Sequence, residues 1–598
     1  MKKLIITFII SLIGGTCAMY GQTIIKDNEL FNVYQSIPQE GIFIHPNASL
    51  FFAGERLYYS LYCLNLKTQN LSSLSKIAYV ELVGKNNQIV FQHKIKLGNG
   101  LGQGDYFLPA TVATGNYKLV GYTQWMKNSG KNHFFQADIH IINPYQEIPS
   151  THLDPKFQDS VNVDSIEYNL PIPNSKTAIV NGVGNKYLSV ATNGKDFNKR
   201  EEVSLSIRSL KDSLAYGNYS ISVRRKDPIE EPTKLHSHDY LSLYPHKNNR
   251  ISLGINDSLA LLELRGELIS GVVVSESNNE PVENKKVVIS LPGKEFVVDI
   301  ANTNENGKFY FNLDEAYDNT SGILQLLDEN KEEMKILVDK HSSPDYSGLE
   351  FDKFVVSEDF EELILKRSIH NQIENAYADV KSDTIIAAQT EITFYRDFQE
   401  RYDLDDYTRF NTIEETMIEI IDHVWIKNND QGEAVFQVRP FDLYLQTNGL
   451  LPMVILDGVF IQHHEDIMDL NAKRIERVYI SRNRYMVGSV VFQGILALET
   501  SSGDFNQTYY KEYLNNLTLF KPQPLKKYFF QNHQLDTESG HVPDFRYQLF
   551  WQPNFVLDNM AKTINFYTSD IAGDYEIRLE GFTDQGKSIS LKEMISVD

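Results

Sequence analysis

The chain has 598 residues and a formal net charge of −22 at pH 7, from 79 acidic and 57 basic side chains. At roughly 150 residues per domain, this length predicts about four domains, and the negative charge disfavours nucleic acids and anionic membrane surfaces as partners. Hydrophobic residues make up 42% and charged residues 23% of the chain, a balance typical of folded proteins.

Residues 1–22 are predicted to be an export signal, because two lysines precede an apolar run at 4–13. A lipoprotein signal at Cys17 is the alternative. Without Cys17 the mature chain keeps only the thiol of Cys63, which excludes an intrachain disulfide framework and a cysteine-based metal site. No later segment reaches the about 20 apolar residues of a transmembrane helix, so we expect no transmembrane segment in the mature chain.

Residues 23–145 are predicted to form a β-sandwich. Alternating runs such as 57–62 suit half-buried antiparallel strands. Ala53 and Gly54 suit a turn between two strands, the second of which begins at Glu55.

The same region resembles a known domain. Residues 51–59, with the order Ala-Gly-Glu, and 104–144, with Gly115 in a turn and Trp125, are similar to the second macroglobulin domain of alpha-2-macroglobulin-like proteins exported by Gram-negative bacteria. The resemblance implies a sandwich fold, in which we expect Trp125 to be a core anchor.

Residues 146–262 carry strand patterns, for example at 203–207 and 219–223, but no recognisable motif. We expect a second β-sandwich there. Within residues 263–340, the recognisable pattern starts at Gly271 to Ser275. It also includes the hairpin signal Asn306-Gly307. They resemble the carboxypeptidase regulatory-like domain, which implies a small sandwich without the zinc-binding catalytic domain of the peptidases.

Residues 341–390 are charged and more helical in pattern, and are predicted to connect to a different kind of domain. Beyond them, Thr412 and Glu415 predict a capping box. The apolar face of the helix that it opens consists of Ile413, Met417, Ile420 and Ile421.

Residues 391–506 resemble the plug of TonB-dependent receptors, which implies a small α+β domain. Three segments carry the pattern: 452–460, 475–480 and 488–498. Asp457-Gly458 predicts a tight turn after a buried strand. Only about 95 residues follow, too few for a receptor barrel of about 22 strands, so we expect a protein other than a complete transporter.

Residues 507–598 are predicted to form a C-terminal sandwich. The order Phe-Tyr-Thr-Ser-Asp at 566–570, followed by Gly573 and Tyr575, resembles another macroglobulin-type domain of the same exported subfamily. A sandwich that acts as a secretion-sorting domain is the alternative.

No catalytic, cofactor-binding or metal-binding residue is predicted. The Gly-Cys-Gly-Glu-Gln thioester sequence of protease-trapping macroglobulins is absent, which excludes covalent trapping. The clusters at 236–239 and 463–466 contain possible metal ligands, but neighbouring side chains point in different directions and rarely close one coordination sphere. We therefore expect a protein without enzymatic activity or a cofactor.

Together these patterns predict a mainly β protein with tandem β-sandwich domains and a small α+β plug-like domain. We expect an exported, outer-membrane-associated subunit or accessory protein that binds a separate outer-membrane barrel or its complex, in transport, secretion or barrel insertion. The side of the outer membrane stays open. The expected interface residues are Leu456, Asp457, Gly458, Val459, Phe460, Arg482, Arg484, Tyr485 and Gly488.

The alternative function is capture of a peptide, glycan or siderophore by an envelope ligand-binding protein. Exposed aromatic side chains beside a cleft would favour this alternative. A long unpaired strand edge or an apolar patch would favour a protein partner.

Overall fold

The computed structural model describes residues 22–24, 28–130, 133–149, 152, 186–229, 231–232, 234–243, 253, 257–293, 296–314, 317, 319–328, 330–386, 398–442, 449–534 and 542–598. The predicted export signal and Cys17 lie outside these residues, apart from Gln22. The fold is mainly β, with tandem β-sandwiches, which confirms the predicted fold class. No helix in the described part of the chain is long and apolar enough to cross a lipid bilayer.

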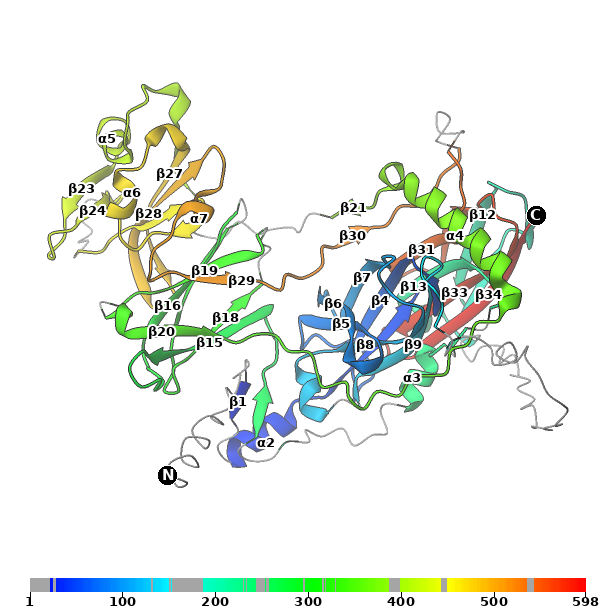
Figure 1. The fold of residues 1–598 in the computed structure, drawn as a ribbon. Coiled ribbons are helices and arrows are strands. Elements are labelled where there is room, and N and C mark those ends of the chain that lie inside the picture. The colour runs from blue at the N-terminus through cyan, green and yellow to red at the C-terminus, as the bar shows by residue number, and fades with distance from the viewer. Residues whose placement is uncertain are drawn as a thin grey trace, which may run out of the picture. The chain divides into compact units, whose positions relative to one another are not determined.

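The chain divides into two compact units (Figure 1). The larger unit contains residues 23–264, 343–387 and 522–598, and the smaller unit contains 1–22, 265–342 and 388–521. Each unit is therefore assembled from segments that are far apart in the sequence.

The first sandwich of the larger unit lies within 23–145, the range in which a sandwich was predicted. Its sheets have the strand orders β2-β4-β7 and β3-β9-β8-β5-β6. The strands are β2 (Glu40–Pro46), β3 (Leu50–Phe52), β4 (Arg56–Asn65), β5 (Ile77–Val83), β6 (Ile89–Lys96), β7 (Leu101–Phe107), β8 (Gly115–Tyr122) and β9 (Phe135–Ile142). Gly54 turns the chain between β3 and β4 at φ +92°, a conformation that favours glycine. Trp125 is buried, as expected of a core anchor.

The second sandwich corrects the predicted domain boundaries, because 146–262 and 507–598 do not form separate sandwiches. Its sheets are β10-β12-β32 and β11-β34-β33-β13-β31. The strands are β10 (Leu188–Thr192), β11 (Asp196–Phe197), β12 (Glu202–Ser209), β13 (Gly217–Arg225), β31 (Gln548–Leu557), β32 (Ala561–Tyr567), β33 (Gly573–Thr583) and β34 (Ser588–Val597). Strand β13 lies between β31 and β33, with Ile221 opposite Leu579. Strand alternation is a local signal that does not specify which strands pair.

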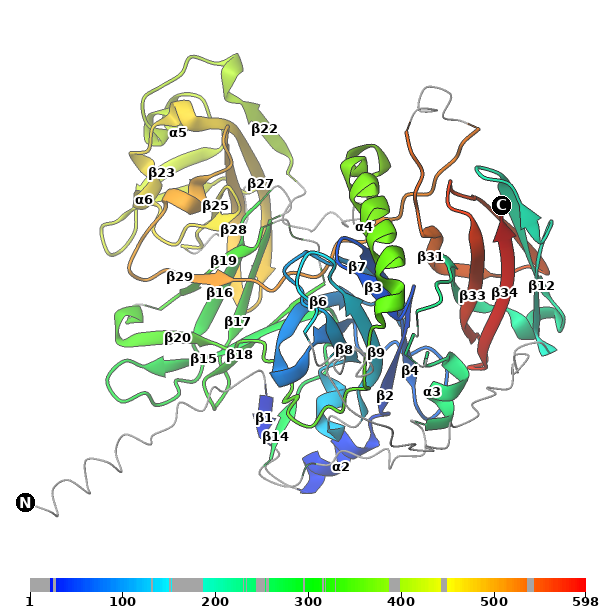
Figure 2. The same cartoon turned by 45° about the vertical axis from the view of Figure 1, so that its right-hand side comes forward.

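The segment 343–387 is more than a connector, since it packs on the larger unit. Helix α4 (Glu361–Ala376) lies against the first sandwich, where Ile364 joins a cluster with Phe52 and Ile142 (Figure 2). After α4, β21 (Thr384–Ile385) pairs with β30 (Lys526–Lys527). The other elements of this unit are α2 (Asn28–Ser36), α3 (Ser237–Leu243) and β14 (Ser258–Ala260), which pairs with β1 (Gln22–Ile24).

In the smaller unit, residues 267–338 form a sandwich with sheets β18-β15-β20 and β17-β16-β19-β29. The strands are β15 (Glu267–Ser275), β16 (Lys286–Leu291), β17 (Val297–Asn302), β18 (Lys308–Leu313), β19 (Ser321–Leu326), β20 (Met334–Val338) and β29 (Asn515–Thr518). A sandwich over 263–340 was predicted, but β29 comes from the segment assigned to the C-terminal domain. It pairs with β19, with Leu517 opposite Gly322.

The rest of the smaller unit is an α+β domain. Its sheet has the order β22-β27-β28-β25-β26 beside a ribbon of β23 and β24. The elements are β22 (Glu400–Asp403), α5 (Ile413–Glu419), β23 (Val424–Asn428), β24 (Ala434–Val438), β25 (Met453–Leu456), β26 (Val459–Phe460), α6 (Glu465–Met468), β27 (Ile475–Val487), β28 (Val490–Thr500) and α7 (Phe505–Thr508).

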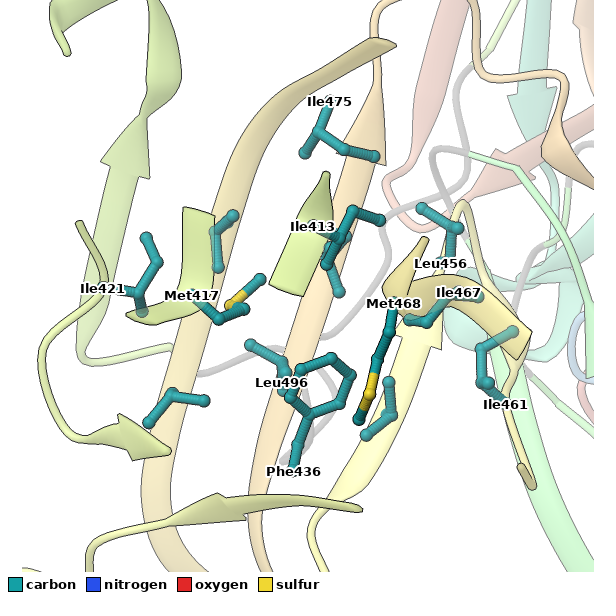
Figure 3. Close-up of a cluster of buried hydrophobic side chains, with 14 of the residues drawn as sticks. Ile413, Met417, Ile421, Phe436, Leu456, Ile461, Ile467, Met468, Ile475 and Leu496 are labelled. Atoms are coloured by element: carbon teal, nitrogen blue, oxygen red, sulfur yellow. The ribbon is translucent and has the colours of Figure 1, made fainter. Parts of the chain in front are cut away.

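The predicted capping box opens α5, where the backbone N–H of Glu415 donates to the Thr412 hydroxyl at 3.1 Å. Ile413 and Met417 point from α5 into the core that covers the sheet, where they meet Phe436 and Leu496 (Figure 3). The helix ends at Glu419, so the predicted core residue Ile421 lies just beyond it.

Candidate functional site

The predicted interface hairpin is buried inside the smaller unit. Leu456, Val459 and Phe460 all belong to the core. The carboxylate of Asp457 accepts hydrogen bonds from the backbone N–H groups of Thr500, at 2.7 Å, and Phe505, at 3.1 Å. This side chain therefore ties the hairpin to the end of β28 and the start of α7.

The far side of this hairpin packs on the small sandwich. The Phe460 carbonyl accepts from Gln325 Nε2 at 2.7 Å, and its N–H donates to Ser290 Oγ at 3.1 Å. A Cβ on Gly458 would lie 2.5 Å from Phe296 Cβ. The prediction that Leu456, Asp457, Gly458, Val459 and Phe460 line a surface for a partner is therefore corrected: they hold two domains of one unit together.

The second predicted segment packs partly within its own domain and partly on the small sandwich. Arg482 donates from Nε to the Arg439 carbonyl at 2.9 Å, and Tyr485 shares a hydrogen bond with Ser481. A Cβ on Gly488 would lie 2.0 Å from the Ile300 carbonyl oxygen. The side chain of Arg484 is exposed.

The larger unit contains a buried ion network centred on Glu55, the glutamate of the Ala-Gly-Glu turn. Arg367 of α4 donates to both Glu55 carboxylate oxygens, from Nε at 2.7 Å and Nη2 at 2.9 Å. Arg224 of β13 adds a third hydrogen bond at 2.6 Å, and Asn371 a fourth at 3.2 Å. One carboxylate therefore joins the first sandwich, the second sandwich and the inserted helix.

The network keeps Glu55 ionised. Burial alone would raise the pKa of this carboxyl, but the charges and hydrogen bonds of Arg367 and Arg224 outweigh burial and lower the pKa to about 2. Arg367 also pairs with Asp227 and lies 4.2 Å above the centre of the Phe52 ring. Both carboxylate oxygens of Glu55 already accept hydrogen bonds from Arg367, so this side chain is unsuited to acid–base chemistry.

Beside this network lies a cleft of about 540 Å³. Segments from the first sandwich, from α4 and the residues after it, and from the ends of β30 and β31 line the cleft. Its aromatic lining consists of Tyr58, Phe107, Tyr528, Phe529, Phe545, Tyr547, Phe550 and Trp551.

The inner wall is an aromatic stack with two polar groups that have no partner. The Tyr58 ring lies 6.2 Å from the Trp551 ring in a stacked arrangement and 5.0 Å from the Tyr528 ring in an edge-to-face arrangement. Tyr528 and Trp551 are both more than nine-tenths buried. Within the described part of the chain, neither the Tyr528 hydroxyl nor the Trp551 indole N–H has a hydrogen-bond partner.

The mouth of the cleft is apolar. Phe107 is 41% exposed, Phe529 36% and Ile385 65%, and all three line the cleft. Ile386 and Leu525, on the same β21–β30 ladder, are also exposed. Exposed hydrophobic side chains gathered around a cleft commonly mark a binding site.

Several charged groups of the wall are paired with one another. Arg56 and Lys526 both contact Asp105, at 2.6 and 2.8 Å. Lys381 contacts Glu374 at 2.7 Å, and the second Glu374 oxygen accepts from the backbone N–H of Phe545. Asp379 and Asp383 also line the cleft, so the wall carries carboxylates as well as aromatic rings.

In the clusters at 236–239 and 463–466, which contain possible metal ligands, the histidines have other contacts. His464 is buried and accepts from the Phe436 N–H at 3.0 Å, and His463 contacts Lys331. His236 contacts Glu580 at 2.7 Å. Among the described residues, no group of three or more His, Cys, Asp and Glu side chains is placed to hold a metal ion. The Cys63 thiol is buried, which raises its pKa well above the ordinary value.

Sequence reasoning did not find the cleft. Trp551 and Tyr528 lie in segments assigned to a C-terminal sandwich, and Ile385 in the connector. The only local sign was the density of aromatic residues at 528–551.

Comparison with known proteins found no matching family model and no matching curated protein. Among solved structures, alpha-2-macroglobulin from Salmonella, reacted with methylamine, aligns over 97% of this chain and 40% of its own, with 9% identity and a TM-score of 0.23. The native Escherichia coli alpha-2-macroglobulin aligns over 96% and 41%, with 10% identity and a TM-score of 0.23. The Yersinia pseudotuberculosis adhesin InvE aligns over 50% and 57%, with 14% identity and a TM-score of 0.12.

The chain spans about two fifths of the length of these two macroglobulins. The low TM-scores and identities assign neither a family nor an activity to the chain.

Proposed function

We propose that this protein is a non-enzymatic binding protein of the cell envelope, and that the cleft beside Glu55 holds its ligand. One observation carries the proposal: an aromatic-lined cleft of about 540 Å³ exposes the apolar side chains of Phe107, Phe529 and Ile385. Clefts of roughly 300–1,000 Å³ are typical of sites for small ligands.

The hydrophobic effect supports this proposal. A ligand that covers the exposed side chains of Phe107, Phe529 and Ile385 removes apolar surface from water, at roughly 25 cal/mol for each Å² that it buries.

The wall around the cleft is suited to hold its shape without a ligand. On one side of the cleft, Arg367 is hydrogen-bonded to both carboxylate oxygens of Glu55. On another side, Arg56 and Lys526 are both paired with Asp105. A preorganised wall lowers the entropic cost of binding.

The fluorescent dye 8-anilinonaphthalene-1-sulfonate tests whether the cleft accepts ligands, because the dye combines aromatic rings with an anionic acceptor. We expect the full chain to bind it at one site, with energy transfer from its tryptophans, of which the chain has three. The double variant Phe107→Ser/Phe529→Ser should bind at least about tenfold more weakly. Val556→Ser, at an exposed position of β31 outside the cleft, is the matched control. Equal binding by all three proteins would refute the proposal.

Export and outer-membrane association are part of the proposal. They rest on the signal at 1–22. We also propose that the smaller unit combines a carboxypeptidase regulatory-like sandwich with a plug-like domain. The tight turn at Asp457 and Gly458, with φ angles of +48° and +80°, supports the plug-like hairpin.

A second candidate function is association with an outer-membrane barrel or its complex. Three exposed side chains at the tip of the β27–β28 hairpin favour it: Arg484, Met486, which is 69% exposed, and Val491, which is 38% exposed. A photoreactive benzoylphenylalanine at position 486 should then crosslink to a barrel protein in intact cells. The same probe at Tyr510, also highly exposed in this unit, should not. Equal crosslinking from both positions would argue against a specific contact.

A further inference from the structure

We infer that a second, smaller pocket of the larger unit binds a small oxyanion, such as phosphate or a carboxylate. The pocket has a volume of about 40 Å³ and is lined by residues from the turn after β2, from the end of β13 and the residues that follow it, and from β33. The site is distinct from the cleft beside Glu55, although Arg224 lines both.

The pocket contains a buried arginine without a carboxylate partner. Arg578 of β33 is 4% exposed. Its Nε donates to His45 Nε2 at 3.2 Å, and its Nη2 donates to the Pro46 carbonyl at 2.9 Å. Within the described part of the chain, this guanidinium makes no ion pair. Because the transfer of a charge from water into the interior is costly, buried charges in proteins are normally paired. Arg578 therefore needs a counter-charge.

One edge of this guanidinium is open to a ligand. Its third nitrogen, Nη1, makes no hydrogen bond to any described residue. It is also not one of the unpartnered side-chain atoms that are closed off from solvent. Since Arg578 lines the pocket, its free N–H groups can donate charge-assisted hydrogen bonds to an oxyanion there.

The acidic side chains nearest to Arg578 along β33 have other partners. Glu580, two residues further on, contacts His236 at 2.7 Å. Glu576, two residues before, contacts Lys592 at 2.5 Å. Neither carboxylate reaches Arg578, so the counter-charge has to come from outside the chain.

The lining as a whole is cationic. Five cationic and two acidic side chains line the pocket, in a chain whose formal net charge is −22. Three of the five cations are paired with carboxylates: Arg224, Arg225 and Lys234. The exposed Lys226 resembles Arg578 in making no ion pair with a described residue.

The titration of two neighbouring groups reflects this excess of positive charge. Burial alone would raise the pKa of Glu576, but the charges of Lys234, Arg578 and Lys592 lower it to about 2. Burial, followed by the charge of Arg578, lowers the pKa of His45 well below its ordinary value. His45 therefore stays a neutral acceptor, and the surroundings of the pocket favour an anion.

The size of the pocket limits the ligand. A water molecule needs about 10–15 Å³ of such a space, so about 40 Å³ holds about three oxygen-sized atoms. A carboxylate or one face of a phosphate or sulfate ion fits this space. Water molecules would also fit, but they carry no charge and would leave Arg578 without a counter-charge.

Urea unfolding of the full chain in the presence of anions tests the site. Sodium phosphate, sulfate, acetate and formate are each compared with chloride at equal ionic strength. An anion that binds only the folded chain raises the unfolding midpoint, and its affinity follows from the concentration dependence. We expect at least one anion to raise the midpoint above its value in chloride. A rise with phosphate and sulfate alone assigns the site to a tetrahedral anion, and a rise with acetate and formate alone assigns it to a carboxylate.

Variants separate binding in the pocket from general salt effects, which act alike on every variant. Arg578→Met removes the buried guanidinium and should abolish the anion-specific rise. Lys226→Gln, at an exposed position, should weaken anion binding about threefold to tenfold. Glu576→Gln removes a competing carboxylate and should strengthen it by a similar factor. Lys587→Gln, at an exposed position between β33 and β34 and outside the pocket, is the control and should leave it unchanged.

The opposite effects expected for Lys226→Gln and Glu576→Gln decide the test even if Arg578→Met does not fold. Equal anion effects in these two variants and in Lys587→Gln would overturn the inference, because the anions would then act as general salts. An effect of all four anions no larger than that of chloride would also overturn it. Neither result bears on the cleft, which the dye tests separately.

Discussion

Arg367 donates two hydrogen bonds to the carboxylate of Glu55, although 312 residues separate the two in the chain. Glu55 follows the turn between the first strands of one sandwich, and Arg367 lies on the helix of the inserted segment. Both side chains are buried. This ion pair anchors α4, and α4 with the residues after it forms one side of the cleft.

The first prediction concerns this pair. Arg367→Met removes the guanidinium and leaves Glu55 and Asp227 buried with fewer counter-charges, so the larger unit should lose about 3–5 kcal/mol of unfolding free energy. Urea unfolding followed by circular dichroism measures the loss. Arg401→Met, which breaks the exposed contact with Asp403, is the control and should leave the midpoint nearly unchanged. Similar midpoints for both variants would contradict the role of Arg367.

The second prediction is a pH dependence of stability. The pKa of Glu55 is about 2 in the folded chain, against an ordinary value of 4.5. A lowered pKa stabilises the fold above pH 4.5, and this stabilisation is lost as the pH falls from 4.5 towards 2. The lowering corresponds to about 3 kcal/mol. Urea midpoints between pH 7 and pH 2.5 measure it.

Glu55→Gln provides the comparison for this pH dependence. The variant cannot ionise, so it should be less stable than the unsubstituted chain at pH 7 and lose less stability between pH 4.5 and 2.5. Parallel curves for the two proteins would show that other carboxyl groups account for the acid sensitivity.

The third prediction separates crowding from backbone strain. Gly458 and Gly449 have φ angles of +80° and +76°, but only Gly458 has atoms within 4 Å of an added Cβ. Gly449→Ala should cost about 1 kcal/mol, from the left-handed backbone alone. Gly458→Ala should cost about 2 kcal/mol more, because its Cβ collides with Phe296. Chemical denaturation of both variants tests this, and equal losses would place the hairpin away from the small sandwich.

The fourth prediction tests the shared sandwich. Truncation after residue 541 removes β31 to β34, which leaves β13 without either of its neighbours and β12 with β10 alone. The amides of 217–225 should then lose their protection in hydrogen exchange. Retained protection would mean that 146–262 folds alone, as its strand pattern first suggested.

The sequence by itself determined the local elements. The turn at Gly54, the capping box of Thr412 and Glu415, and the hairpin at Asp457-Gly458 all have the predicted form. Caps, turns and strand alternation depend on neighbours a few residues away, so they can be read from the sequence.

Only the tertiary structure decided which strands pair and where a cleft forms. Strand β13 pairs with β31 and β33 from the other end of the chain, and β29 completes the small sandwich. These pairings depend on contacts between remote segments, which strand patterns do not specify. The same contacts bring Tyr58, Ile385, Tyr528 and Trp551 to one wall. Contacts between remote segments also bury the hairpin at 456–460, which the sequence pattern predicted to lie at a surface.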